Sequence, residues 1–297
     1  MSNEKLLDPR DMYYQEKFPE QESQSPAIQK EMSPQPDCGE VSYKGKGRLE
    51  GRHALITGGD SGIGRAVAIA YAREGANVAI HYLPGEETDA EEVKEIIEAE
   101  GQKAKIIPGD FRKEGVASQV FEAAYEAFGQ IDLLVLNAAQ QFAQKNLENL
   151  TMQQVKDTFN VNVISMFEMV KTAEKRLPTG ASIITTTSVQ SFDPSETLMD
   201  YAATNSAVSS LTVSLSKYFA EKGIRVNGVA PGPIWTPLQL DGGQLPGGVS
   251  EFGQKSLLGR AGQPVELAPV YVFLASKEAS YVTGQIYGIT GGQNINL

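Results

Sequence analysis

The stretch Thr57-Gly58-Gly59-Asp60-Ser61-Gly62-Ile63-Gly64 connects a short apolar run, His53 to Thr57, to an alanine-rich stretch that continues to Glu74. A strand, a glycine-rich turn and a helix in this order form the unit with which doubly wound sheets bind phosphate groups. Glycines let the backbone approach the ligand, and the N–H groups that begin the helix face its negative charge. Glycine-rich turns without a ligand also occur between strands and helices, so the turn alone predicts the fold more firmly than the ligand.

Downstream of this turn, short apolar runs alternate with stretches of helical spacing to the end of the chain. The predicted strands cover residues 53–57, 77–82, 103–108, 131–136, 182–187, 224–230 and 285–290. The predicted helices cover about 63–74, 88–100, 114–128, a long segment from 151, 201–222, and a segment after 264. Most strands are apolar nearly throughout, which is typical of a parallel sheet covered on both faces. Seven strands and six helices therefore predict an α/β fold, a doubly wound seven-stranded parallel sheet in a single domain.

Two of these helices begin with a capping box, in which a threonine is followed three residues later by Glu or Gln. The first pairs Thr88 with Glu91, and the second pairs Thr151 with Gln154. Such pairs satisfy the free N–H groups of the first helical turn, so we expect the helices to begin at these threonines.

Residues 1–50 differ in composition from the predicted domain at 51–297. This sixth of the chain holds five of the fifteen prolines among Gln, Ser, Glu and Lys. We interpret it as an extended N-terminal arm, which Tyr13, Tyr14 and Phe18 could fasten to the domain surface. A loosely ordered tail is the alternative that the composition leaves open.

Composition and charge exclude several functional classes. The 26 basic and 37 acidic side chains give a net charge of −11, which argues against nucleic-acid binding and against a basic membrane-surface patch. The longest apolar run, Ala66 to Ala72, is too short to cross a bilayer, and the first thirty residues contain no apolar leader. The single cysteine, Cys38, permits no internal disulfide and no cysteine metal cluster. We expect a soluble cytoplasmic protein without a bound metal.

Further polar and glycine positions follow the predicted strands in a fixed order. They are Gly109-Asp110, Asn137-Ala138, Asn162, Ser188, Tyr201 and Pro231-Gly232. With the turn at 58–64, this order resembles the short-chain dehydrogenase/reductase family over residues 52–297. The proline-rich arm and the stretch 231–236 are similar to bacterial members with N-terminal extensions, the general-stress or aldehyde-reductase-like oxidoreductases. The resemblance implies a Rossmann sheet that binds NAD or NADP.

The resemblance also implies which residues hold the cofactor. These are Gly58, Asp60, Ser61, Gly62, Ile63, Gly64, Tyr82, Leu83, Asp110, Phe111, Asn137, Ala138, Ala139, Tyr201, Asn205, Pro231, Gly232, Ile234 and Thr236. Asp110 would bond the adenine with Phe111 beside it, and Ile234 and Thr236 would face the nicotinamide carboxamide. The family's Asn-Asn-Ala-Gly reads here as residues 136–139, Leu-Asn-Ala-Ala, which is a modest departure.

The choice between NAD and NADP depends on the end of the second strand, where an acid would bond the ribose and a base would hold a 2′-phosphate. Residues 81–84 read His-Tyr-Leu-Pro and offer neither, so the choice stays open. Eight acids against Lys94 in residues 86–100 concentrate the negative charge in one helix. We interpret this helix mainly as a solvated surface. A second interpretation is that its negative charge mildly disfavours the 2′-phosphate of NADP.

The resemblance assigns catalysis to Ser188, Tyr201 and Asn162. Tyr201 would exchange the proton with the forming alkoxide, Ser188 would polarise the carbonyl, and Asn162 would orient a relay water. The family places a lysine four residues after the tyrosine, on the same helical face, and here that position is Asn205. The next lysine on this helix, Lys217, is sixteen residues after Tyr201 and lies roughly 24 Å from it.

Two other Tyr-x-x-x-Lys matches, Tyr13 to Lys17 and Tyr218 to Lys222, do not follow a strand-terminal serine. The sequence therefore favours a carbonyl–alcohol oxidoreductase impaired by Asn205, acting on a small carbonyl or alcohol substrate. The alternative is a dinucleotide-binding protein with little or no catalysis, and a clonal or engineered change at Asn205 is a third possibility.

The family's members are usually homodimers or homotetramers, so the resemblance implies a homo-oligomer. The loop from Trp235 to Gly262 is predicted to form the substrate lid. Its side chains Trp235, Leu238, Leu240 and Leu245 are candidates for an apolar lining.

Overall fold

The computed structural model describes residues 6–21 and 23–295 and confirms the doubly wound parallel sheet. Its seven strands pair in the order β3-β2-β1-β4-β5-β6-β7, and every neighbouring pair is parallel. The strands are β1 (His53–Thr57), β2 (Asn77–Tyr82), β3 (Ala104–Pro108), β4 (Leu133–Leu136), β5 (Ser182–Thr186), β6 (Arg225–Pro231) and β7 (Ile286–Ile289). The order reverses between β1 and β4, which is where doubly wound sheets bind their ligands.

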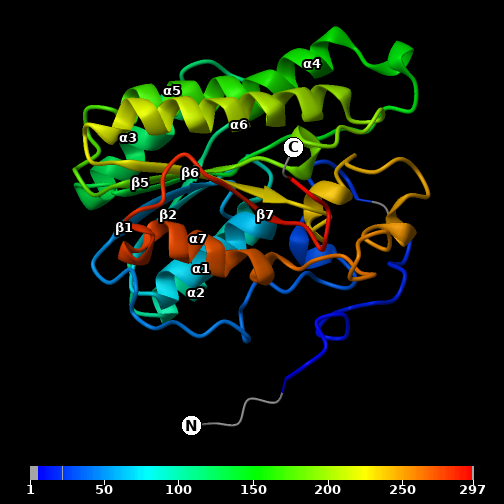
Figure 1. Cartoon of the computed structure of the whole chain (residues 1–297), viewed down its shortest axis with the longest axis horizontal. Coiled ribbons are helices and arrows are strands. Elements are labelled where there is room, and N and C mark those ends of the chain that lie inside the picture. The colour runs from blue at the N-terminus through cyan, green and yellow to red at the C-terminus, as the bar shows by residue number, and fades with distance from the viewer. Residues whose placement is uncertain (1–5, 22, 296–297) are drawn as a thin grey trace.

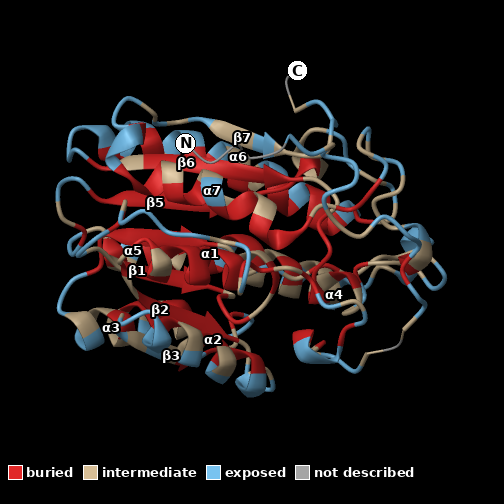
Figure 2. Ribbon diagram, turned by 90° about the horizontal axis from the view of Figure 1, so that it is seen from below, coloured by how far each residue is buried: buried red, intermediate tan, exposed pale blue. Residues whose placement is uncertain are grey.

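Helices cover both faces of this sheet. They are α1 (Gly62–Arg73), α2 (Glu87–Ala99), α3 (Val116–Phe128), α4 (Met152–Phe159), α5 (Ser165–Ala173), α6 (Met199–Ala220) and α7 (Pro264–Ala275). In Figure 1, α3, α5 and α6 lie on one face of the sheet, and α1, α2 and α7 lie on the other. Figure 2 shows that the strands between these two layers are buried almost throughout. None of the helices in the described part of the chain is long and apolar enough to cross a membrane.

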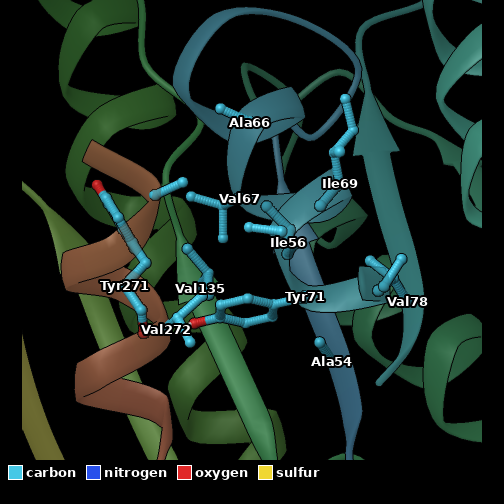
Figure 3. Close-up of a cluster of buried hydrophobic side chains, with 14 of the residues drawn as sticks. Ala54, Ile56, Ala66, Val67, Ile69, Tyr71, Val78, Val135, Tyr271 and Val272 are labelled. Atoms are coloured by element: carbon cyan, nitrogen blue, oxygen red, sulfur yellow. Dashed lines mark hydrogen bonds between the residues drawn. The ribbon is translucent and has the colours of Figure 1, made fainter. Parts of the chain in front are cut away.

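The core beneath α1 and α7 leads directly to the carboxyl edge of the sheet. Tyr71 of α1 points toward α7, and its hydroxyl donates to the carbonyl oxygen of Tyr271, 3.1 Å away (Figure 3). The Tyr271 hydroxyl in turn lies 2.7 Å from Thr186 Oγ1, which donates to Asn137 Oδ1 over 3.1 Å. Buried hydroxyl groups thus connect the helix packing to the ends of β4 and β5, where the predicted site begins.

The predicted helix from Thr151 is interrupted. Thr151 caps α4 as expected, since its Oγ1 accepts the N–H of Gln154 over 3.1 Å. A π-helical turn at Asn160–Ile164 then separates α4 from α5. Such a turn contains an extra residue, and it often marks a functional site in a helix that otherwise keeps its regular period.

The predicted helix start at Thr88 is wrong. The residue that caps α2 is Glu86, and Thr88 lies within the first helical turn. The chain turns sharply at Gly85, whose φ is +112°, and the N–H of Ala90 already bonds the carbonyl oxygen of Glu86. The turn after β2 therefore starts the helix before the threonine is reached.

The N-terminal arm follows the domain surface without forming a strand or an α-helix among its described residues. Phe18 is 2% exposed and stacks on Trp235 with ring centroids 3.8 Å apart, while Tyr14 stacks on Phe18. The Tyr13 ring lies against the guanidinium of Arg260. The three aromatic side chains expected to fasten the arm therefore all contact other residues, and two of them form one stack with the loop after β6.

Candidate active site

A cavity of about 890 Å³ opens at the carboxyl edge of the sheet, where the strand order reverses between β1 and β4. Its walls include most of the predicted site residues. They are Gly58, Asp60, Ser61, Gly62, Ile63, Leu83, Asp110, Phe111, Asn137, Ala138, Ala139, Ser188, Tyr201, Asn205, Pro231, Gly232, Ile234 and Thr236. The glycine-rich turn and the predicted catalytic side chains thus share one cavity, while Gly64, Tyr82 and Asn162 lie outside its lining.

The glycine-rich turn has the shape that a phosphate group requires. Gly58 and Gly62 have φ values of +60° and +50°, and a Cβ at Gly62 would lie 2.9 Å from Thr236 Cγ2. Gly64 does not line the cavity, but a Cβ there would lie 1.7 Å from the carbonyl oxygen of Gly58, so the turn closes only around glycine. Among the described residues, the N–H groups of Ile63 and Gly64 find no acceptor, which leaves them for an anion at the start of α1.

A residue of the arm, Gln29, accepts a hydrogen bond from the first N–H group of α1. Gln29 is 3% exposed, and its Oε1 accepts the N–H of Gly62 over 2.7 Å. The backbone N–H of Gln29 donates to Asp89 of α2 over 2.6 Å. The arm therefore joins the start of α1 to α2 and forms one side of the turn, and Ser25 and Ala27 extend that side into the cavity wall.

His81 fixes the turn against the end of β3. The N–H of Gly58 donates to His81 Nδ1 over 3.3 Å, so the proton lies on Nε2, which donates to the carbonyl oxygen of Gly109 over 2.9 Å. Burial lowers the pKa of His81 to about 4, so the ring is neutral at pH 7. Phe111 stacks on this ring with centroids 3.9 Å apart, which presents the Phe111 side chain as an apolar wall of the cavity.

Asp110 is held by a charged neighbour. Arg112 donates to both of its carboxylate oxygens, at 2.8 Å and 3.0 Å. These hydrogen bonds keep the pKa of Asp110 below its usual range, so the side chain is ionised. Asn137 is similarly fixed, because its Nδ2 donates to the carbonyl oxygens of Thr57 and Gly58. Both side chains form rigid walls beside the turn.

Tyr201, Ser188 and Asn205 meet on the opposite side of the cavity. Ser188 ends the segment after β5, and Tyr201 and Asn205 lie one turn apart in α6. Burial raises the pKa of Tyr201, while hydrogen bonds with the Ser188 and Asn205 side chains lower it in part. The Asn205 Nδ2 also donates to the carbonyl oxygen of Tyr201 over 2.8 Å. No positively charged group in the described part of the chain lowers the pKa of Tyr201, so its hydroxyl is protonated at neutral pH.

Asn162 lies behind this group, in the π-helical turn. Its Oδ1 accepts the N–H of Gln140 over 2.7 Å, and its Nδ2 donates to the Gln140 carbonyl oxygen and to Thr204 Oγ1, both over 3.0 Å. Asn162 is 3% exposed and does not line the cavity. Its amide therefore supports the backbone beside Asn137 and the helix that carries Tyr201.

Three side chains expected in the cavity point elsewhere. Tyr82 precedes Leu83 at the end of β2, and because successive strand residues face opposite sides, Leu83 lines the cavity while Tyr82 packs into the core. Trp235 and Leu240 of the predicted lid pack against Phe18 of the arm. These two apolar side chains contact the arm and do not line the cavity. Leu238 and Leu245 of the same loop do line it.

The cavity also contains acids that were not expected there. Glu86 and Asp241 line it together with Asp60, and Asp89 of the same acidic helix is fully buried rather than solvated. Glu86 lies 22 residues after Gly64, a spacing typical of the acid that binds the ribose in dinucleotide folds, and this spacing could have identified it from the sequence. No sequence motif predicts that Asp241 or the arm residue Ser25 lines the cavity, because contacts between segments distant in the sequence bring both residues there.

Comparison with known proteins identifies several relatives of the chain. Residues 58–294 match the family model described as enoyl-(acyl carrier protein) reductase. The chain is 58% identical to the uncharacterized oxidoreductase YhxD of Bacillus subtilis over 98% of its own length and 99% of the relative's. It is 44% identical to general stress protein 39 of Bacillus subtilis, over 94% and 97% of the two chains. The structure of a short chain dehydrogenase from Burkholderia cenocepacia in complex with NADP aligns with a TM-score of 0.76 at 31% identity, covering 82% of this chain and 98% of that one.

Proposed function

The chain belongs to the short-chain dehydrogenase/reductase family, and we propose that it is an NAD(P)-dependent oxidoreductase interconverting a carbonyl and an alcohol by hydride transfer. One observation carries the proposal. Tyr201 and Ser188 line the same cavity as the glycine-rich turn. The cavity therefore combines a proton donor for the forming alkoxide with backbone N–H groups that can bind a pyrophosphate. A dinucleotide and a carbonyl substrate could bind there side by side.

The described residues fit a nicotinamide dinucleotide, and the solved relative with NADP supports this fit. We assign the pyrophosphate to the N–H groups of Ile63 and Gly64, and the adenine to the wall made by Asp110 and Phe111. We assign the nicotinamide end to the last residue of β6, Pro231, and to Gly232, Ile234 and Thr236 of the segment that follows it. When bound, the nicotinamide supplies or accepts the hydride.

The protein's own residues handle the proton. In the reducing direction, Ser188 Oγ donates to the substrate carbonyl oxygen, and the Tyr201 hydroxyl transfers its proton to that oxygen as negative charge develops. Burial keeps the Tyr201 pKa above its ordinary value of 10, so the donor form predominates at neutral pH. In the oxidising direction Tyr201 must first lose its proton. The raised pKa makes this step less favourable than proton donation at neutral pH.

Asn205 makes alcohol oxidation slow. A cation within about 4–6 Å lowers the pKa of an acid by roughly 1–3 units, and an amide cannot replace this effect. The neutral site at Asn205 also supports a second candidate, a dinucleotide-binding protein with little or no catalysis. The oxidoreductase is the stronger candidate because Ser188 and Tyr201 are both present and both line the cavity.

We also propose that residues 51–297 form the catalytic domain and residues 1–50 an arm that completes its cavity. The substrate that we propose is a small carbonyl or alcohol, which would bind beside Tyr201 and Ser188 in the same cavity. The acidic composition and single cysteine fit a cytoplasmic enzyme. Its assembly as a dimer or tetramer would cover the apolar side chains exposed on α5 and α6.

Binding and turnover separate the two candidates. Thermal-shift titrations with NAD, NADH, NADP and NADPH come first, followed by a screen of aldehydes and ketones with the reduced form that binds. An enzyme is expected to consume the reduced cofactor, and Tyr201→Phe is expected to lose at least 100-fold in rate while binding the dinucleotide normally. Stabilisation without turnover by any carbonyl would support the binding protein, and no stabilisation by any dinucleotide would reject both candidates.

A further inference from the structure

Gln29 comes from the N-terminal arm, ahead of the residues 58–294 that match the family model, yet it contacts the glycine-rich turn. Its side chain is 3% exposed. Its Oε1 accepts the N–H of Gly62 over 2.7 Å, and its Nε2 donates to the sulfur of Cys38 over 3.4 Å. The Cys38 thiol in turn donates to the carbonyl oxygen of Gly62 over 3.4 Å. Two buried side chains of the arm therefore bind both polar groups of the Gly62 backbone.

Gly62 controls the direction of the N–H groups that follow it. Its φ of +50° leads the chain from the glycine-rich turn into α1, and the next two N–H groups, those of Ile63 and Gly64, are the ones that we assign to the pyrophosphate. A buried Gly62 N–H without an acceptor is unfavourable, so without Gln29 the turn would shift to find another partner. Gln29 therefore fixes the peptide group that precedes the anion-binding N–H groups.

Gln29 is itself held in place from the opposite side. The N–H groups of Gln29 and Lys30 donate to the two carboxyl oxygens of Asp89, over 2.6 Å and 3.3 Å. Asp89 belongs to α2 and is fully buried. A group that its surroundings already hold loses little freedom when a ligand binds. The arm is therefore preorganised against the turn.

Two arginine side chains of α1 hold the next part of the arm. Arg65 Nε donates to Glu40 Oε1 over 2.8 Å. The Arg73 guanidinium donates to the carbonyl oxygens of Glu40 and Tyr43 over 2.7 Å and 2.8 Å. Because α1 begins at the glycine-rich turn, the turn, the helix and the arm form one hydrogen-bonded unit.

The same part of the arm also reaches the nicotinamide end of the proposed site. The carbonyl oxygen of Pro34, five residues after Gln29, accepts the Nε1–H of Trp235 over 2.8 Å. Trp235 lies between Ile234 and Thr236, which we assign to the nicotinamide. The arm therefore contacts both of the segments that the proposed dinucleotide would connect.

We propose that the N-terminal arm belongs to the dinucleotide site, with Gln29 as a positioning residue that directs the N–H groups of Ile63 and Gly64 toward the pyrophosphate. The proposal rests on the proposed function, because it takes a nicotinamide dinucleotide as the ligand. Gln29 does not line the cavity and acts through Gly62. Its effect is therefore on the affinity for phosphate-bearing ligands.

Isothermal titration of the full chain with ADP tests the proposal without relying on turnover, because ADP carries the adenosine and the pyrophosphate of a dinucleotide. Gln29→Leu keeps a side chain of similar volume and removes the acceptor for the Gly62 N–H. We expect it to weaken ADP binding about tenfold, the effect of leaving one buried N–H unsatisfied. Adenosine lacks the phosphates, so its weaker binding, measured by saturation-transfer NMR, is expected to stay unchanged. Gln24→Leu changes an exposed glutamine of the same arm and is expected to keep the wild-type affinity for both ligands.

The wild type provides a second measurement that needs no substitution. Binding free energies are reciprocal, so a docked arm that strengthens ADP binding must itself be stabilised by ADP. Hydrogen exchange followed by mass spectrometry is therefore expected to slow when ADP binds, in the arm peptide that contains the Gln29 and Lys30 N–H groups. Adenosine is expected to slow it much less.

Three results would overturn the proposal while leaving the proposed function intact. ADP binding by Gln29→Leu that is as tight as in the wild type, or tighter, would show that Gln29 does not position the turn. Equal losses for ADP and adenosine would show a purely structural role. Exchange in the arm that ADP leaves unchanged would show that the arm is independent of the ligand. A wild type that binds neither ADP nor any dinucleotide would overturn the proposed function as well.

Discussion

At the scale of single residues, the proposed reaction depends on how readily the Tyr201 hydroxyl loses its proton. The side chain is buried and receives no help from a cation, so its pKa lies above the ordinary value of 10. A group with a raised pKa remains protonated until the pH passes that value. Carbonyl reduction, which uses the protonated form, is therefore favoured at neutral pH, and alcohol oxidation is expected to accelerate as the pH rises.

A buried carboxylate, that of Glu74, holds the end of the arm. Glu74 is fully buried and accepts hydrogen bonds from the Tyr43 hydroxyl, the Lys46 N–H and the Arg48 N–H and guanidinium at 2.6–3.0 Å. Burial alone would raise its pKa, but the bonds from Arg48 and Tyr43 outweigh it and hold the pKa at about 2. Because the pKa is lower than the ordinary 4.5, the stabilisation is complete above about pH 4.5 and is lost as the pH falls toward 2.

Replacing this carboxylate tests that assignment. Glu74→Gln is expected to lower the free energy of unfolding by about 2–4 kcal/mol at pH 7, since it leaves Arg48 without its partner. Urea unfolding should show the difference from wild type shrinking between pH 4.5 and pH 2. Glu221 occupies the corresponding end of α6 but is exposed, so Glu221→Gln is the control with little expected effect. A Glu74→Gln effect that is the same at pH 7 and pH 3 would contradict the account.

At the scale of elements, the arm and the loop after β6 stabilise each other. Trp235 is fully buried beneath Phe18, and its Nε1 donates to the carbonyl oxygen of Pro34 over 2.8 Å. Further contacts follow on the same loop, where Lys17 pairs with Glu251 and the Ser23 hydroxyl donates to the carbonyl oxygen of Leu240. The segment predicted as a lid is therefore covered by the arm.

Fluorescence reports this contact, because Trp235 is the single tryptophan of the chain. Phe18→Ala is expected to shift its emission to longer wavelength and to increase its quenching by acrylamide, since the substitution opens a cavity beside the indole. Leu7→Ala, at an arm residue that is 63% exposed, serves as the control. Identical emission and quenching in Phe18→Ala and wild type would show that the arm does not shield this loop.

The elements themselves were largely predictable from the sequence, and their mutual contacts were not. Strand ends fall within two residues of the prediction because buried parallel strands are nearly continuous apolar runs. The π-helical turn at Asn160–Ile164 was missed, since helical spacing does not reveal one inserted residue. Gly58, Ser188 and Tyr201, which the family resemblance assigns to the site, all line the cavity. Asp241 could not be placed, because long-range packing brings it there.

At the scale of the whole molecule, one outer face remains apolar. Ile164, Phe167 and Tyr218 are 52%, 53% and 56% exposed, and a groove of about 620 Å³ runs between α5 and α6 beside them. Exposed apolar surface of this kind commonly marks a protein interface. A second copy of the chain is the partner that the proposed assembly requires.

Light scattering after gel filtration measures that assembly. The wild type is expected to have the mass of a dimer or tetramer, and Phe167→Glu to reduce it, because a buried unpaired charge would oppose association. Leu147→Glu changes an exposed leucine that does not line this groove and is expected to keep the wild-type mass. A monomeric wild type would refute the proposed assembly, and an unchanged mass for Phe167→Glu would exclude this face as the interface.

In the proposed mechanism Tyr201 transfers the proton, and Asn205 leaves its hydroxyl poorly activated. The most direct measurement is the pH dependence of alcohol oxidation by wild type and Asn205→Lys, with the dinucleotide that binds and an alcohol matching an active carbonyl. We predict that the lysine increases the rate at pH 7 by about 10- to 1000-fold and moves the rise in activity to lower pH, as expected for a pKa lowered by 1–3 units. Equal rates and profiles in the two proteins, at equal cofactor affinity, would contradict this mechanism.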